Sequence, residues 1–117
     1  VVMSGDSHCA WANNLHDAAG QLVAVEVGVT ALSSPTKCLD AWLPDLGVAQ
    51  CLADCNPEVV ASDDSHNGFV RLTLTPDQAD AEWMAVDTIV SRDFEASVVK
   101  RFSASAMPVG VGPLREV

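Results

Sequence analysis

Basic side chains are scarce in this sequence of 117 residues: six lysines and arginines stand against sixteen aspartates and glutamates, which gives a formal net charge of −10. Because the chain carries so few positive charges, we expect it to bind neither nucleic-acid backbones nor anionic membrane surfaces. An acidic balance suits hard metal cations, but solubility explains it equally well.

Long apolar runs are also missing. The longest run, Leu22 to Val29, is interrupted by Glu26 and is far shorter than the roughly 20 residues of a membrane-spanning helix. We therefore expect no transmembrane segment. The length allows one domain at most. Because the chain starts at Val1 and opens directly in an apolar stretch, we expect it to be a piece of a longer protein.

The motifs of several enzyme classes are absent as well. Ser33 and Ser34 lack the G-x-S-x-G turn of serine hydrolases. Gly110 and Gly112 lack the third glycine and the strand-to-helix context of a dinucleotide-binding loop. The sequence therefore does not point to either of these classes.

Four cysteines, Cys9, Cys38, Cys51 and Cys55, fit either an oxidising compartment or a cytosolic protein with buried thiols. Cys51 and Cys55 form a C-x3-C pair, which is not the C-x2-C of zinc ribbons and thioredoxins. For an exported protein we favour a disulfide within this region, one that could include Cys38. Cys9 is expected to be a small buried thiol.

Alternating apolar residues predict a strand-rich chain. Residues 10–15 fit either a helical turn or a strand, and 17–21 are expected to form a turn. Weak periodicity predicts a long irregular loop with one or two short helices at 32–64, and the Pro- and Gly-containing end predicts a flexible C-terminal tail at 103–117. The predicted strands are 1–3, 22–30, 69–75, 81–90 and 96–102.

The opening stretch carries the strongest chemical signal. The apolar strand at 1–3 runs into Ser4-Gly5-Asp6-Ser7-His8, and ligand groups collect in loops beyond the carboxyl ends of strands in α/β folds. A carboxylate and an imidazole suit iron, manganese or zinc, but the same pair fits a loop aspartate that caps backbone amides and a surface histidine. Because tight metal binding usually needs at least three protein ligands, further ligands would lie outside this chain.

His16 and His66 lie beside acidic residues and are expected to be solvated.

Three stretches, in register, resemble the C-terminal part of the PhoD-like alkaline phosphatase/phosphodiesterase family of the calcineurin-like metallophosphoesterases. The first is Val1 to Leu15, with Gly5-Asp6-Ser7-His8 followed by Trp11-Ala12. The second is Val25 to Pro35, a strand that ends in Ser-Pro, and the third is His66 to Thr88, which resembles the terminal hairpin of the family.

The resemblance implies an α/β (α+β) fold: the β-rich C-terminal part of a metallophosphoesterase αββα sandwich, mostly strands and hairpins with a long irregular loop. Residues 1–102 would be an incomplete part of that domain. Asp6 and His8 would stand where the two histidines of the superfamily's Gly-His-x-His element each contact a metal. The cysteines at 38, 51 and 55 match no feature of the family.

The function implied by the resemblance is metal-assisted hydrolysis of phosphate esters with iron and calcium, in a periplasmic or secreted protein. The family's upstream Asp, Asp and Asn ligand motifs are not in this chain, so the remainder of the domain would be its partner, and the isolated piece is expected to be inactive. The alternative hypothesis is a non-catalytic β-rich binding or interaction domain in which Asp6 and His8 have no role.

Overall fold

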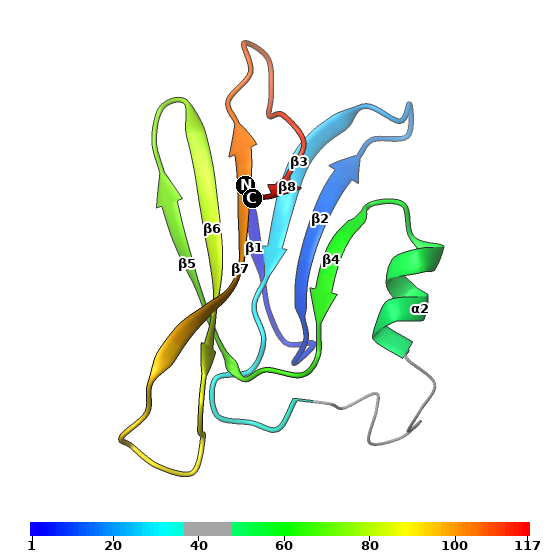
Figure 1. Cartoon of the computed structure of the whole chain (residues 1–117). Coiled ribbons are helices and arrows are strands. Elements are labelled where there is room, and N and C mark those ends of the chain that lie inside the picture. The colour runs from blue at the N-terminus through cyan, green and yellow to red at the C-terminus, as the bar shows by residue number, and fades with distance from the viewer. Residues whose placement is uncertain (37–47) are drawn as a thin grey trace.

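The computed structural model describes residues 1–36 and 48–117 (Figure 1). Cys38, part of the disulfide hypothesis, lies outside these residues. The described residues form two four-stranded sheets and one helix. The elements, in chain order, are β1 (Val2–Ser4), β2 (Ala10–His16), β3 (Leu22–Gly28), α2 (Val48–Cys55), β4 (Val59–Asp63), β5 (Gly68–Leu74), β6 (Gln78–Val86), β7 (Ala96–Ser105) and β8 (Arg115–Glu116).

The first sheet has the strand order β1-β3-β2-β4. β2 and β3 form a hairpin, and its turn is held by the Asp17 carboxylate, which accepts hydrogen bonds of 2.9 Å from the backbone amides of Ala19 and Gln21. β1 pairs in parallel with the other side of β3, while β4 pairs antiparallel with β2. It follows that β1, β3 and β4 all run in the same direction and end at the same edge of the sheet.

The second sheet is an antiparallel meander in the order β5-β6-β7-β8. Its first strand starts at a glycine for a steric reason. Gly68 faces Ala85 across the ladder, and a Cβ at this position would come within 1.8 Å of the carbonyl oxygen of Met84. Only glycine allows the two backbones to approach so closely.

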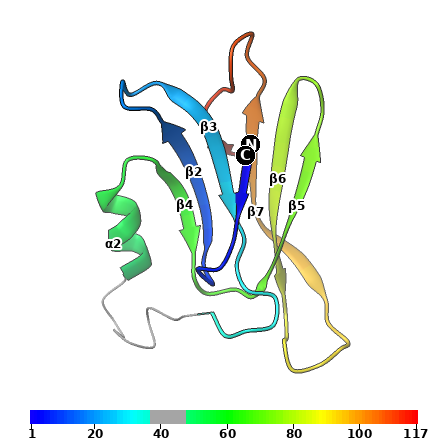
Figure 2. The same cartoon turned by 180° about the vertical axis from the view of Figure 1, so that it is seen from behind.

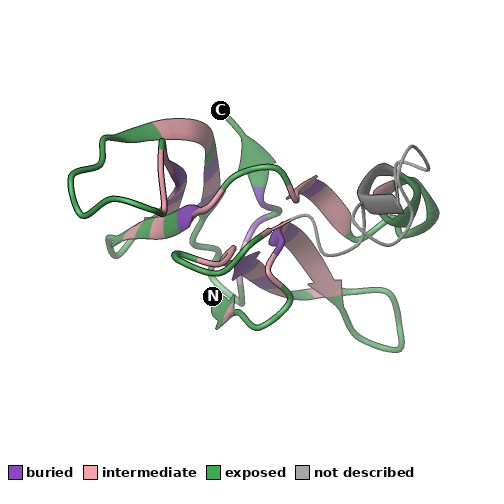
Figure 3. Cartoon of the chain, turned by 90° about the horizontal axis from the view of Figure 1, so that it is seen from below, coloured by how far each residue is buried: buried purple, intermediate pink, exposed green. Residues whose placement is uncertain are grey.

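One apolar core joins the two sheets. Val25 and Val27 contribute from β3, and Trp83 and Phe102 contribute from β6 and β7. The rings of Trp83 and Phe102 meet at a tilt, with their centroids 4.7 Å apart. Seen from below, the buried parts of the strands lie between the sheets (Figure 3). α2 lies beyond β4 on the outer side of the first sheet (Figures 1 and 2).

The predicted strand-rich architecture is confirmed. The strands expected at 22–30, 69–75, 81–90 and 96–102 correspond to β3, β5, β6 and β7, and 10–15 is a strand rather than a helical turn. The region 32–64 contains α2, in keeping with the short helices expected there, and an unpredicted strand, β4. This strand was missed because it is only five residues long and begins two residues after Pro57.

Residues 103–117, expected to form a flexible tail, are instead part of the second sheet. β7 continues through Ser105, and β8 pairs Arg115 with Ser103. Leu114 is buried in the core, and its backbone amide donates a 2.8 Å hydrogen bond to the side-chain oxygen of Asn14 on β2. These contacts with residues distant in the sequence order residues 103–117. No local sequence pattern predicts such contacts.

Candidate functional site

Polar side chains gather where three parallel strands of the first sheet end. The loop after β1 carries Asp6 and His8, the loop after β3 carries Thr30, and β4 ends at Asp63, three residues before His66. Because the carboxyl ends of parallel strands share an edge, loops far apart in sequence meet there. This edge of the first sheet is the candidate site.

The backbone of the loop after β1 is strained at both candidate ligands. Asp6 has a φ of 75° and His8 a φ of 57°, in the left-handed region that side chains other than glycine rarely adopt. Each such residue costs of the order of 1 to 3 kcal/mol, and residues of this kind cluster at active sites and ligand clamps. The Ser7 hydroxyl, which donates to the carbonyl oxygen of Cys9 at 3.1 Å, helps to hold the loop. Asp6 is exposed and His8 is half-buried.

The ring of His8 has a defined tautomer. Its Nδ1 lies 3.0 Å from the carbonyl oxygen of Pro35, in the loop after β3. Since a carbonyl can only accept, Nδ1 carries the proton and Nε2 carries the lone pair of the neutral ring. Histidine ligands of metals almost always donate their second ring nitrogen in this way. The contact also gives a physical role to the Ser-Pro segment of the second matching stretch.

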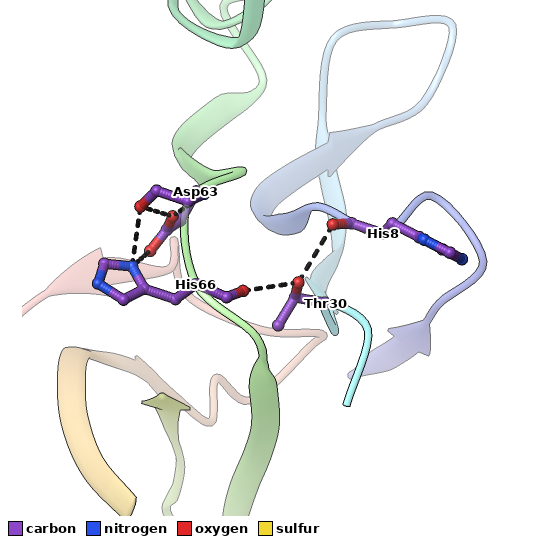
Figure 4. A network of polar contacts seen from close by, with 5 residues as sticks. His8, Thr30, Asp63 and His66 are labelled. Carbon is purple, nitrogen blue, oxygen red and sulfur yellow. Dashed lines mark hydrogen bonds and ion pairs between the residues drawn. The ribbon is translucent and has the colours of Figure 1, made fainter. Parts of the chain in front are cut away.

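Thr30, in the loop after β3, connects the loop after β1 with the loop after β4. Its hydroxyl lies 3.1 Å from the carbonyl oxygen of His8 and 2.9 Å from that of His66. The backbone at His8 is therefore held against the backbone at His66. The two imidazole rings nevertheless point away from each other, on opposite sides of Thr30 (Figure 4).

A second polar cluster forms around Asp63. Its carboxylate accepts hydrogen bonds of 2.7 Å from the hydroxyl and the backbone amide of Ser65, and Nδ1 of His66 lies 2.7 Å from its other oxygen. Burial acts to raise the pKa of Asp63, but the hydrogen bonds from Ser65 and His66 outweigh it, so that the pKa is lowered overall. Ser65 and Asp63 contact the same nitrogen of His66. This is not the arrangement of a hydrolase triad, in which serine and aspartate use opposite ring nitrogens.

The structure thus brings Asp6 and His8 into one loop and keeps His66 separate from them. Within residues 1–36 and 48–117, no three His, Cys, Asp or Glu side chains come together as a metal site. Asp63 and His66 help to line a cavity of about 10 Å³ between the sheets, which is the size of a single water and cannot hold a substrate. Sequence reasoning assigned no role to His66 and expected it to be solvated beside acidic residues. The structure shows it exposed and in contact with Asp63, three residues earlier in the chain.

The cysteines match the expectation of a buried thiol but not that of a disulfide between Cys51 and Cys55. Cys9 is buried, as expected. Cys51 and Cys55 form no disulfide and lie exposed on α2. Of the disulfides that the sequence left open for this region, the one between Cys51 and Cys55 is not formed. A regular helix holds the Cβ atoms of residues four apart about 5 to 6 Å from each other, whereas a disulfide needs about 3.5 to 4.5 Å.

Fold and site together define a strand-rich, two-sheet structure with a strained Asp-x-His loop at the carboxyl ends of parallel strands. No protein family matches the sequence, and no curated protein matches it either. Among solved structures, the chain is similar to one described as "Structure of PhoD", with a TM-score of 0.75 and 24% identity.

The similarity covers 99% of this chain and 22% of the PhoD chain. At 24% identity the likeness shows the fold alone. At the level of the fold, it confirms the resemblance to the PhoD-like family seen in the sequence. The chain spans about a fifth of the length of the solved relative. No helix in the described part of the chain is long and apolar enough to cross a membrane.

Proposed function

We propose that this chain is the C-terminal segment of a metal-dependent phosphoesterase of the PhoD type and that it supplies two metal ligands, Asp6 and His8. The observation that carries the proposal is the loop after β1. Two non-glycine residues there hold left-handed backbone conformations, and His8 has its Nδ1 proton engaged by Pro35. Neither feature is needed simply to connect β1 to β2.

The donor set fits the hard cations of such a centre, since it pairs a carboxylate with an imidazole. Iron and calcium, when bound, would supply Lewis acidity and a water of lowered pKa. Asp6 and His8 hold the cations and transfer no protons themselves. The hydrogen bond to Pro35 orients the His8 ring, and Thr30 fixes the backbone from which that ring projects.

The remaining ligands belong to the rest of the domain, upstream of this chain. The chain covers 22% of the similar solved structure, which leaves most of a domain of that kind outside it. The substrates are phosphate esters, the setting is periplasmic or secreted, and the isolated segment is inactive.

The test uses the longer protein that contains this segment, with p-nitrophenyl phosphate and bis-p-nitrophenyl phosphate as substrates in the presence of iron and calcium. We expect Asp6→Asn and His8→Ala each to lower activity and metal content by at least about tenfold. His16→Ala is the matched control, because it removes an exposed imidazole outside the loop. Full activity in both loop variants would contradict the proposal and favour a non-catalytic binding domain.

A further inference from the structure

The two exposed cysteines of α2 lie on the same side of the helix. Cys51 and Cys55 are four residues apart, and residues at this spacing sit one above the other on a helix face. The last turn is fixed by Asn56, whose side-chain amide donates a 2.6 Å hydrogen bond to the carbonyl oxygen of Leu52. This cap holds Cys55 in helical register with Cys51.

The spacing that excludes a disulfide suits chelation. A cation with metal–sulfur bonds of about 2.3 Å separates its two thiolates by up to roughly 4.6 Å. Two side chains whose Cβ atoms lie about 5 to 6 Å apart reach this separation without unwinding the helix. Cys51 and Cys55 are therefore placed to share one ion between their sulfur atoms.

The two thiols already interact. The pKa of the Cys55 thiol is raised, first by its hydrogen bond with Cys51 and the charge of that residue, then by desolvation and by Asp54. The carboxyl end of a helix and the net charge of −10 both favour a cation at this position.

We propose that Cys51 and Cys55 form a two-thiolate site on α2 for one soft d10 metal cation. On binding, each thiol releases its proton to solvent and each sulfur donates an electron pair to the metal, with no change in oxidation state. Soft thiolate ligands select ions such as monovalent copper, and two protein ligands suit an ion of low coordination number. The site is independent of Asp6 and His8.

The experiment titrates the 117-residue chain with Cd²⁺ and follows the thiolate-to-cadmium charge-transfer absorption. The background is Cys38→Ser, which leaves Cys9, Cys51 and Cys55, of which Cys9 is buried. We expect one cadmium per chain. Cys51→Ser and Cys55→Ser should each weaken binding by about 100-fold or more, because the second bond of a chelate forms within the molecule.

The matched control keeps the number of thiols and moves one of them. In Ala53→Cys with Cys55→Ser, the two thiols are two residues apart and point to different sides of the helix, so binding should be as weak as in Cys55→Ser alone. The proposal would be overturned if this control bound cadmium as tightly as the Cys38→Ser background does. It would also be overturned if Cys51→Ser bound cadmium as tightly as that background. Asp6→Asn with His8→Ala should leave the titration unchanged, which separates this site from the proposed phosphoesterase centre.

Discussion

The two sheets are built in different ways, and the candidate site lies at only one of them. In the second sheet, each strand pairs with its neighbour in sequence. In the first sheet, β3 is inserted between β1 and β2. Register shifts occur in both sheets, in the two ladders of β2 and in the ladder between β6 and β7, so the difference lies in the strand order. The second sheet brings the large aromatic pair, Trp83 and Phe102, to the core.

The irregular order of the first sheet is what creates the candidate site. A meander of neighbouring strands alternates in direction, so that consecutive loops lie at opposite edges. Because β1, β3 and β4 run in parallel, their loops converge and place Asp6, Thr30 and Asp63 at one edge. We infer that the second sheet mainly stabilises the fold, while the first sheet positions functional groups at some cost in local strain.

Substitution in the second sheet should have the largest effect on stability. Phe102 has 0% of its surface exposed and stacks against Trp83. Removing a buried phenylalanine side chain costs about 3 to 5 kcal/mol, through lost burial and the cavity left behind. We expect Phe102→Ala to lower the free energy of unfolding by this amount in urea titrations of the chain. Phe94→Ala, at an exposed position, is the control. Similar losses in the two variants would mean that the burial of Phe102 is not what stabilises the second sheet.

A change at Thr30 should have a smaller effect that is concentrated at the edge of the first sheet. Thr30→Val keeps the shape of the side chain but removes the hydroxyl between the carbonyl oxygens of His8 and His66. The expected loss is about 1 kcal/mol, the worth of one hydrogen bond, because the hydroxyl carries a single proton and the contact with His66 is exposed to water. Hydrogen exchange should show the loss of protection in the loops around residues 8 and 66. Thr30→Ser restores the hydroxyl and should recover most of the stability. Uniform loss of protection across both sheets would argue against a local bridge.

The acid dependence of stability tests the cluster at the end of β4. The pKa of Asp63 is lower in the folded chain than its ordinary value of 3.8. The contribution of Asp63 to the free energy of unfolding is therefore complete above the pKa that Asp63 has in the unfolded chain. It is lost as the pH falls through the lower pKa that Asp63 has in the folded chain. We expect the free energy of unfolding to fall as the pH drops below about 4, with a contribution from Asp63 of about 1 kcal/mol.

Asp63→Asn isolates this contribution from that of the other acids. Its unfolding free energy should be lower than that of the unchanged chain at neutral pH, and the difference should shrink as the pH falls below about 4. Asp64→Asn removes the adjacent carboxylate, for which no bond to Ser65 or His66 is seen. If both variants lose the same stability at neutral pH, the hydrogen bonds of Asp63 are not the cause.

The sequence predicted most of the fold where the pattern is local. Val70 and Leu72 alternate with polar residues and mark β5, and Val25 and Val27 mark β3 as a buried strand. It failed where distant contacts decide the structure. The end of the chain is ordered through β7 and through the bond from Leu114 to Asn14, a partner 100 residues away.

Asp6 and His8 could be named as candidates because they closely follow a strand and share a short motif, and their role as metal ligands stays a prediction. The partners of His8 could not be named, since Pro35 and Thr30 lie in another loop and contact His8 only in the folded chain. His66 was expected to be solvated beside acidic residues, and it is exposed in the structure. The sequence did not show that Asp63 is the neighbouring acid that contacts it.

The smallest effect is expected for the charged row on the exposed face of the second sheet. Glu82 on β6 accepts from Arg71 on β5 and from Arg101 on β7, which are its direct partners across the two ladders. The hydrogen bond from Arg71 is the largest influence on the pKa of Glu82 and lowers it. Desolvation opposes this effect, and the hydrogen bond from Arg101 adds to the lowering, so that the pKa is lowered overall. Exposed ion pairs contribute little and are screened by salt. Arg71→Ala should therefore lower the melting temperature only slightly at low ionic strength, and not beyond the Arg92→Ala control in about 1 M salt. A loss that persists in salt would mean that Arg71 stabilises the sheet by packing its aliphatic stem rather than by its charge.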